Sequence, residues 1–166
     1  RPGRGMGHLL PEAIYEAGAR ATFLNHAENP MTMAELAKTI ARAREIGIET
    51  IACADSLAEG TAIAAFRPDI LLCEPTDLIG TGKTADDSYT TAIVAKIRTI
   101  DPGIGIMIAS GITTADDVYR VVRLGADGSG ATSGILSAPD PAKRILEMAE
   151  AIVRAAAVRE SQGSAA

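Results

Sequence analysis

Short apolar runs alternate with longer helix-like segments along almost the whole chain. Five of these runs are bounded by Gly, Pro or Asp, as is typical of strands that are covered on both faces. They occupy residues 21–25, 49–53, 69–74, 105–109 and 126–131. Strands that alternate with helices in this way form a parallel sheet with right-handed crossovers. The chain is therefore predicted to adopt an α/β fold with one parallel sheet.

The segments between these runs carry signals for the start and the end of helices. Thr32 and Glu35 have the spacing of a capping box, and Gly47 and Gly125 stand where a left-handed residue can end a helix. We expect helices at residues 10–17, 32–46, 57–66, 86–100, 114–124 and 141–157. The small, polar tail 158–166 is expected to be disordered, which leaves one domain at residues 1–157.

The number of strands matters, because five βα units fall short of the eight that close a βα barrel of roughly 250 residues. An open five-stranded sheet leaves its two edges unpaired. Residues 1–7 are rich in Gly, begin without Met and have no signal-peptide character. We therefore expect an incomplete barrel that forms the C-terminal part of a longer polypeptide.

Composition excludes several classes of partner. The net charge of −5 disfavours nucleic acid, because binding to a phosphate backbone needs a basic surface. No apolar run approaches the ~20 residues that cross a membrane as a helix. Cys53 and Cys73 lie in apolar runs, and their spacing fits neither a disulfide framework nor a zinc site. We expect a cytoplasmic protein whose two thiols are buried and reduced.

The run 69–74 ends in a carboxylate, and Pro75 stops the strand immediately after it. Glu74 would stand at the carboxyl end of a parallel strand, where βα barrels carry their active sites. A glutamate there can act as a general base in a site from which a lid excludes water. The alternative is a structural role, as a salt-bridge partner or a helix cap.

The loop after Glu74 contains Gly80 and Gly82, and we interpret it as a lid with glycine hinges. Its residues 80–84 have some likeness to a nucleotide-binding P-loop. The P-loop pattern, however, requires Gly at the position of Asp77, so the match fails.

His26 follows the run 21–25, so it is expected at the same edge of the sheet as Glu74. A single strand-end histidine is more often a hydrogen-bonding residue than a catalyst, but its pairing with a carboxylate favours proton-transfer chemistry. Small-residue clusters at 110–113 and 128–134 follow later strands and precede helices. Backbone N–H groups in such loops bind anions, and the last two βα loops of barrels often hold phosphate.

These motifs, in this order, resemble those of the triosephosphate isomerases, most closely the compact archaeal type. Residues 24–29 (Leu-Asn-His-Ala-Glu-Asn) resemble the family's strand-4 motif, and residues 8–18 resemble the helix before it. Glu74-Pro75 and residues 79–83 resemble the strand-6 glutamate and the hinged lid. The resemblance continues through both small-residue loops to the last helix. It implies a TIM (β/α)8 barrel of which strands 4–8 are present.

The resemblance also implies a role for each matching residue. Glu74 would move a proton between two substrate carbons, His26 would polarise the carbonyl, and Glu28 would support the site. The substrate phosphate would be held by Gly80, Gly111, Ser133 and Gly134. The implied activity interconverts dihydroxyacetone phosphate and D-glyceraldehyde 3-phosphate, with neither a metal nor an organic cofactor, in a homodimer or homotetramer.

One departure from the family concerns electrostatics. The family's strand-1 Asn and Lys, which would precede Arg1, have no counterpart in these 166 residues, and Lys83 belongs to the lid. Because positively charged groups of this kind stabilise the transition state, we expect the 166-residue chain to be weakly active or inactive and a complete polypeptide to be active. Two alternatives stay open: an isomerase of another small phosphorylated sugar, and a non-catalytic phosphosugar-binding barrel relic.

Overall fold

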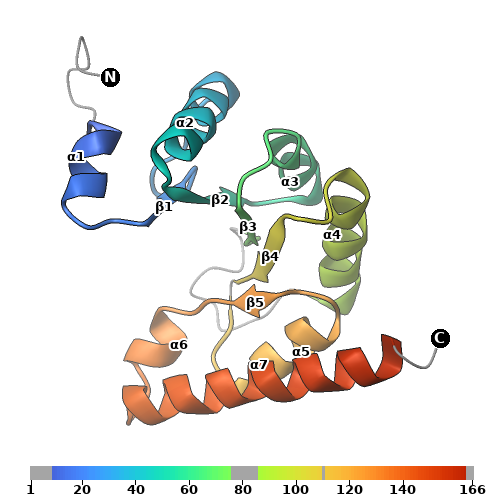
Figure 1. Cartoon of the computed structure of the whole chain (residues 1–166). Coiled ribbons are helices and arrows are strands. Elements are labelled where there is room, and N and C mark those ends of the chain that lie inside the picture. The colour runs from blue at the N-terminus through green and yellow to red at the C-terminus, as the bar shows by residue number, and fades with distance from the viewer. Residues whose placement is uncertain (1–8, 76–85, 110, 164–166) are drawn as a thin grey trace.

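The computed structural model describes residues 9–75, 86–109 and 111–163, and its elements alternate as the sequence predicts (Figure 1). Five strands pair in parallel and in sequence order, β1-β2-β3-β4-β5. They are β1 (Ala21–Leu24), β2 (Glu49–Ala54), β3 (Ile70–Cys73), β4 (Gly105–Ile108) and β5 (Gly128–Ser129). This confirms the predicted α/β fold, an incomplete barrel of five βα units.

Seven helices precede, connect or follow the strands in the described residues. They are α1 (Pro11–Glu16), α2 (Met33–Ile46), α3 (Leu57–Ala64), α4 (Asp87–Ile100), α5 (Ala115–Arg123), α6 (Ser133–Leu136) and α7 (Pro141–Gly163). Six of them correspond to predicted helices, and most of their ends lie within two residues of the predicted ends. The short helix α6 was not expected from the sequence.

The last helix corrects one boundary of the sequence-based prediction. We expected a disordered tail from residue 158, but α7 continues to Gly163. Arg159 explains the extension, because its guanidinium donates to the carbonyl oxygens of Val122 (3.2 Å), in the last turn of α5, and Ala126 (2.6 Å), just after that helix. This contact ties the last turns of α7 to the fold.

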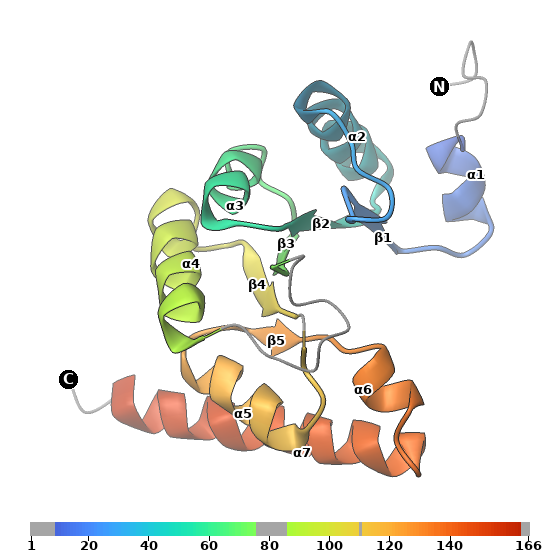
Figure 2. The same cartoon turned by 180° about the vertical axis from the view of Figure 1, so that it is seen from behind.

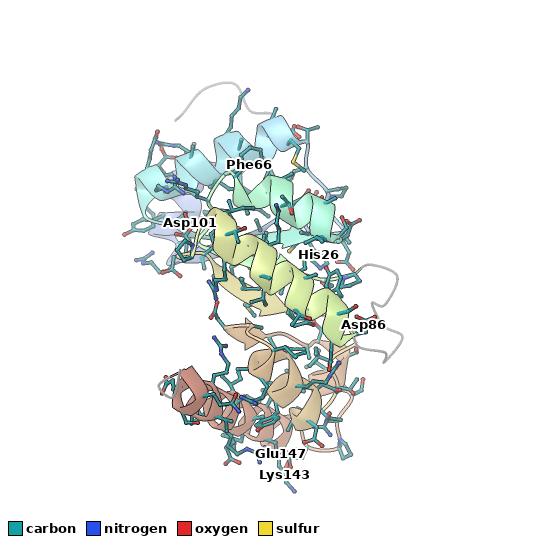
Figure 3. The ribbon with its side chains drawn as sticks, turned by 90° about the vertical axis from the view of Figure 1, so that its right-hand side faces the viewer. His26, Phe66, Asp86, Asp101, Lys143 and Glu147 are labelled. Carbon is teal, nitrogen blue, oxygen red and sulfur yellow. The ribbon has the colours of Figure 1, made fainter. Side chains whose placement is uncertain are left out.

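The predicted helix caps form as expected. Thr32 and Glu35 make a complete capping box at the start of α2, and Gly47 ends that helix in the left-handed conformation with φ 83°. Asp86 caps α4, where its carboxylate accepts a hydrogen bond from the N–H of Tyr89 at 2.8 Å. In Figure 3, Asp86 and His26 lie toward the same side of the molecule, and Asp101, at the other end of α4, lies on the opposite side. Helix starts therefore mark the edge at which the strands end.

The two faces of the sheet have different surroundings, as the turned view in Figure 2 also shows. The outward-facing residues pack under the helices in one large buried cluster that includes Ala52, Leu71, Cys73, Ile106 and Ile108. The opposite face carries a smaller cluster of Cys53, Leu72 and Ala109, against which Ile51 and Met107 pack. Phe23 on this inner face remains 59% exposed, whereas its neighbour Leu24 on the outer face is buried. In the described part of the chain, the inner face is open.

None of the helices within the described ranges is both long enough and apolar enough to cross a membrane. Both cysteines are free thiols and are buried.

Gly47 and Gly125 offer a matched test of the packing at helix ends. Both have positive φ, 83° and 114°, but a Cβ on Gly47 would meet nothing within 4 Å, whereas one on Gly125 would lie 2.8 Å from Val94 Cγ1. Gly47→Ala is expected to lower the free energy of unfolding by about 1 kcal/mol through backbone strain. Gly125→Ala is expected to lower it by about 2–3 kcal/mol, because the contact with Val94 adds to that strain. Urea denaturation followed by circular dichroism measures both, and equal losses would contradict a contribution from Val94.

Candidate active site

Parallel pairing brings the carboxyl ends of the strands to one edge, and both candidate acid–base residues lie there. Glu74 directly follows β3, and its N–H donates to the carbonyl oxygen of Ala54 at 2.8 Å, which extends the strand pairing by one residue. His26 lies two residues after the end of β1. Its Nε2 is 3.8 Å from Oε2 of Glu74. The structure therefore brings together two side chains that are 48 positions apart in the sequence (74 minus 26).

A backbone contact sets the tautomer of His26. The N–H of Glu28 donates to Nδ1 of His26 at 3.3 Å. A neutral imidazole that accepts at Nδ1 carries its proton on Nε2. His26 therefore presents an N–H donor on the side of the ring that faces Glu74.

The Glu28 side chain lies outside this arrangement. It is 91% exposed, and its Oε2 is 4.0 Å from Nδ1 of His26. Neither of the two hollows at this edge is lined by Glu28. Its contact with His26 is therefore made chiefly through its backbone N–H.

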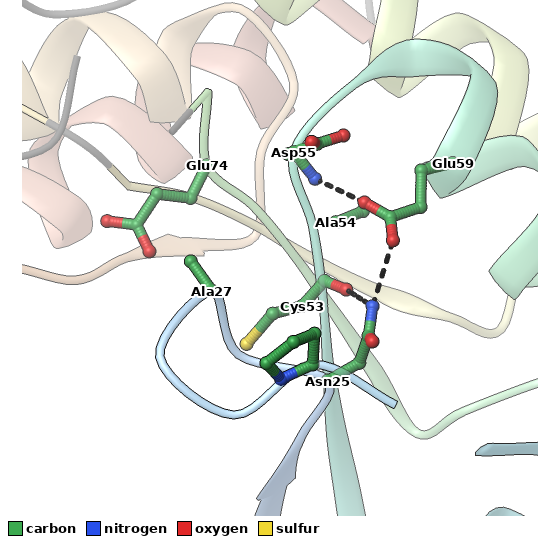
Figure 4. Close-up of a pocket in the computed structure, with 8 residues that line it drawn as sticks. Asn25, Ala27, Cys53, Ala54, Asp55, Glu59 and Glu74 are labelled. Carbon is green, nitrogen blue, oxygen red and sulfur yellow. Dashed lines mark hydrogen bonds between the residues drawn. The ribbon is translucent and has the colours of Figure 1, made fainter. Parts of the chain in front are cut away.

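Two hollows meet at Glu74. The smaller hollow, of about 230 Å³, is shown in Figure 4 and is lined by Asn25, Ala27, Pro30, Cys53, Ala54, Asp55, Glu59 and Glu74. The larger hollow, of about 500 Å³, is lined by Phe23, His26, Leu72, Glu74, Met107, Ala109, Gly130, Ala131 and Thr132. The larger hollow has room for a small molecule between the His26–Glu74 pair and the loop after β5.

The loops after β4 and β5 touch each other beside the larger hollow. Gly111 adopts a positive φ of 69°. A Cβ on Gly134 would lie 2.4 Å from the carbonyl oxygen of Ile112 and 2.7 Å from Cα of Thr113, so only glycine fits there. Ser133 and Gly134 form the first turn of α6, where backbone N–H groups have no partner within the helix. Gly80 lies outside the described residues.

A buried polar network that the sequence did not reveal lies beneath the smaller hollow. Asn25 has a positive φ of 56° and is 9% exposed. Its Nδ2 donates to the carbonyl oxygen of Cys53 at 3.1 Å and to Oε1 of Glu59 at 3.0 Å (Figure 4). The available sequence signal was the Ser56–Glu59 spacing, which has the form of a helix-capping motif and gives no indication of a contact with β1.

Cys53 lines the smaller hollow but is not suited to be a nucleophile. Burial, together with the negative charges of Glu74 and Glu59, raises the pKa of its thiol to about 11. Burial likewise raises the pKa of Cys73, to about 12. Both side chains therefore remain protonated thiols at neutral pH. Among the described residues, no three His, Cys, Asp or Glu side chains gather as a metal site would require.

Comparison with known proteins gives concordant results. The sequence profile of the triosephosphate isomerase family matches residues 2–152. The triosephosphate isomerase of Sulfurisphaera tokodaii is 35% identical over 145 residues, which cover 86% of this chain and 63% of that protein. The enzyme of Sulfolobus acidocaldarius is 35% identical over 157 residues, covering 92% and 67%. The chain thus spans about two thirds of the length of these relatives.

A more distant likeness concerns the fold alone. The crystal structure of the Amycolatopsis orientalis BexX/CysO complex contains a chain that superposes with a TM-score of 0.67 at 18% sequence identity. The superposition covers 90% of this chain and 62% of that chain. The family profile and the relatives are the stronger evidence for family membership, because they match by sequence over most of the chain. From residue 2 to residue 152, this chain belongs to the triosephosphate isomerase family.

Proposed function

We propose that this protein is a triosephosphate isomerase that interconverts dihydroxyacetone phosphate and D-glyceraldehyde 3-phosphate. The observation that carries the proposal is the 3.8 Å separation between His26 Nε2 and Glu74 Oε2 on the wall of one hollow. This separation is too long for a direct hydrogen bond, so an oxygen and a carbon of a small substrate can each approach one of the two groups.

In the proposed reaction, Glu74 removes a proton from the substrate carbon beside the carbonyl group. The carbonyl oxygen then gains negative charge and accepts a hydrogen bond from Nε2–H of His26. Glu74 returns its proton to the adjacent carbon, and His26 transfers the hydroxyl proton between the two enediolate oxygens. The side chains are neutral imidazole and ionised carboxylate at the start and at the end, so the cycle closes without another reactant.

The phosphate group of the substrate is proposed to bind at the loops after β4 and β5. The proposed donors are the backbone N–H groups of Gly111, Ser133 and Gly134, which lie next to the lining of the larger hollow rather than in it, and Gly80 is proposed to contribute from the segment that follows Glu74. Support comes from the close approach of Gly134 to Ile112, which brings these two loops together. Glu28 is proposed to act through its N–H, which fixes the His26 ring. The association of the protein into a homodimer or homotetramer is a further part of the proposal.

Glu74→Gln removes the base while keeping the shape of the side chain. We expect kcat to fall by about 10³-fold or more with little change in KM, because general base catalysis contributes to the transition state and little to binding. Exchange of the substrate C–H proton with solvent deuterium, followed by NMR, should fall in parallel. The control is Glu45→Gln, because Glu45 is exposed and paired with Arg42 near the end of α2, at the other end of the sheet from His26. Undiminished exchange in Glu74→Gln would refute the role of this carboxylate.

The length of the polypeptide provides a second test. These 166 residues contain no counterpart of the family's strand-1 Asn and Lys, and the positive charge of that Lys would face the substrate phosphate. We expect the 166-residue chain to turn over triose phosphates at a small fraction of the rate of a polypeptide that also carries strands 1–3. Steady-state assays of both polypeptides, with three- and four-carbon phosphosugars as substrates, measure the difference. Full turnover by the short chain would contradict the need for those residues, and a preference for the four-carbon substrate would contradict the assignment of the triose.

Gly134→Ala tests the proposed phosphate site. The added Cβ cannot fit 2.4 Å from the Ile112 carbonyl oxygen, so the loops must separate and their N–H groups lose alignment. We expect affinity for inorganic phosphate, measured by thermal-shift titration, to fall about tenfold or more. Gly103→Ala is the matched control, because Gly103 follows α4 at the other end of the sheet and its nearest neighbour is a side-chain oxygen of Asp101 at 3.2 Å. Equal phosphate affinity in both variants would exclude a phosphate role for Gly134.

A further inference from the structure

The His26 loop is closed by the residue that precedes it. Oδ1 of Asn25 accepts a hydrogen bond from the N–H of Met31 at 2.9 Å, so the two ends of the loop 26–30 are held together. Nδ2 of the same side chain donates to Cys53 in β2 and to Glu59 in α3. Both of its amide protons and its oxygen are therefore used, and they connect three separate segments of the fold.

Glu59 departs from the usual role of a carboxylate at its helix position. Glu59 is the third residue of α3, and its N–H donates to Oγ of the N-cap Ser56 at 3.2 Å. Its own carboxylate accepts from the N–H of Asp55 at 2.8 Å and from Nδ2 of Asn25 at 3.0 Å. In α2 and α5 the corresponding carboxylates, Glu35 and Asp117, return to the N-cap N–H. In α3 the carboxylate reaches across β2 to the end of β1.

This bridge joins the His26 loop to an element that also borders the site. A hydrogen bond to an ionised carboxylate is stronger than one between neutral groups, and burial strengthens it further. Asn25 is also held in the left-handed region, which asparagine tolerates better than most other side chains. The direction in which the chain leaves β1, and so the position of His26, depends on this one residue.

We propose that Asn25 and Glu59 are positioning residues, which together hold the His26 imidazole opposite Glu74 with its proton on Nε2. The catalytic part of the proposal rests on the isomerase function proposed above. The structural part, that the bridge determines the ring position and tautomer of His26, does not depend on that function. A placement error of about 1 Å at a reacting group can lower a rate by about 100-fold, so such a bridge has a measurable effect.

Three variants and one control test the bridge. Asn25→Asp keeps the size of the side chain but brings a carboxylate oxygen against both Glu59 and the Cys53 carbonyl. Glu59→Gln is milder, since one of its two acceptor oxygens remains. In the double variant Asn25→Asp/Glu59→Gln, the new amide at position 59 can donate to the new carboxylate at position 25, and its oxygen can accept from the Asp55 N–H. The bridge then forms with donor and acceptor exchanged. Glu35→Gln is the matched control, because it removes a carboxylate from the same position of α2.

The readouts are the side-chain ¹⁵N signals of His26, which report its tautomer, and kcat and KM, measured in a polypeptide that also carries strands 1–3. A His8→Gln background leaves one histidine in these 166 residues, which simplifies the assignment. In Asn25→Asp we expect mixed tautomers and a kcat lowered about 10- to 100-fold, with KM changed less than kcat. Glu59→Gln should show the same changes to a smaller degree. The double variant should recover part of the kcat and part of the single-tautomer signal that Asn25→Asp loses. Glu35→Gln should leave the signals and kcat unchanged, whatever it does to the melting temperature.

The possible outcomes separate this proposal from its alternatives. If Asn25→Asp and Glu59→Gln lower the melting temperature but leave the His26 signals and kcat as they were, the bridge is merely structural and the proposal fails. It also fails if the double variant behaves no better than Asn25→Asp alone. Should Asn25→Asp not fold, Glu59→Gln and the double variant still decide the matter. If a polypeptide that also carries strands 1–3 shows no turnover while the His26 signals respond as expected, the isomerase function is wrong and the structural part of the positioning proposal stands.

Discussion

Parallel pairing in sequence order is the constraint on which the candidate site depends. Adjacent strands lie about 4.8 Å apart, so the backbones of β1 and β3 are separated by about 10 Å with β2 between them. Side chains that extend from both sides close this distance, which is how His26 and Glu74 come within 3.8 Å. Cys53 and Ala54, at the end of β2, are small and line the smaller hollow beside Glu74. A larger side chain at Cys53, which lies on the inner face, would occupy part of this hollow, so the site requires a small residue on the middle strand as well as functional residues on its neighbours.

Much of this arrangement could be predicted, because it depends on local signals and on one topological rule. The strand runs, the Thr32–Glu35 capping box and the strand-end positions of His26 and Glu74 are all visible in the sequence. β5 is shorter than the expected run 126–131, since its Gly-rich sequence supplies few side chains to pack. The short helix α6 has no side-chain cap and therefore gave no start signal. The end of α7 depends on the contacts of Arg159 with the end of α5, which no local pattern encodes.

The Asn25–Glu59 bridge could not be predicted for a related reason. Its two residues are 34 positions apart, and their contact depends on the distance between the end of β1 and the start of α3. In the sequence, Asn25 is one polar residue at the end of a strand, and Glu59 has the spacing of an ordinary helix cap. The same spacing produces a true capping box in α2 and a bridge in α3. Local patterns therefore identify which residues can form hydrogen bonds, while the tertiary fold decides which partners they take.

The distribution of charge around the two hollows indicates how a phosphorylated substrate would lie. Three carboxylate residues, Asp55, Glu59 and Glu74, line the smaller hollow at the end formed by β1 to β3. The far end of the larger hollow is lined by Gly130, Ala131 and Thr132, which carry no charge. Behind these loops the Arg144 guanidinium donates to the Thr113 carbonyl oxygen and brings a positive charge to this side. Because like charges repel strongly in a partly buried site, a phosphate dianion is favoured at the β4–β5 end. With the phosphate at that end, the substrate of the proposed isomerase would place its reacting carbons toward His26 and Glu74.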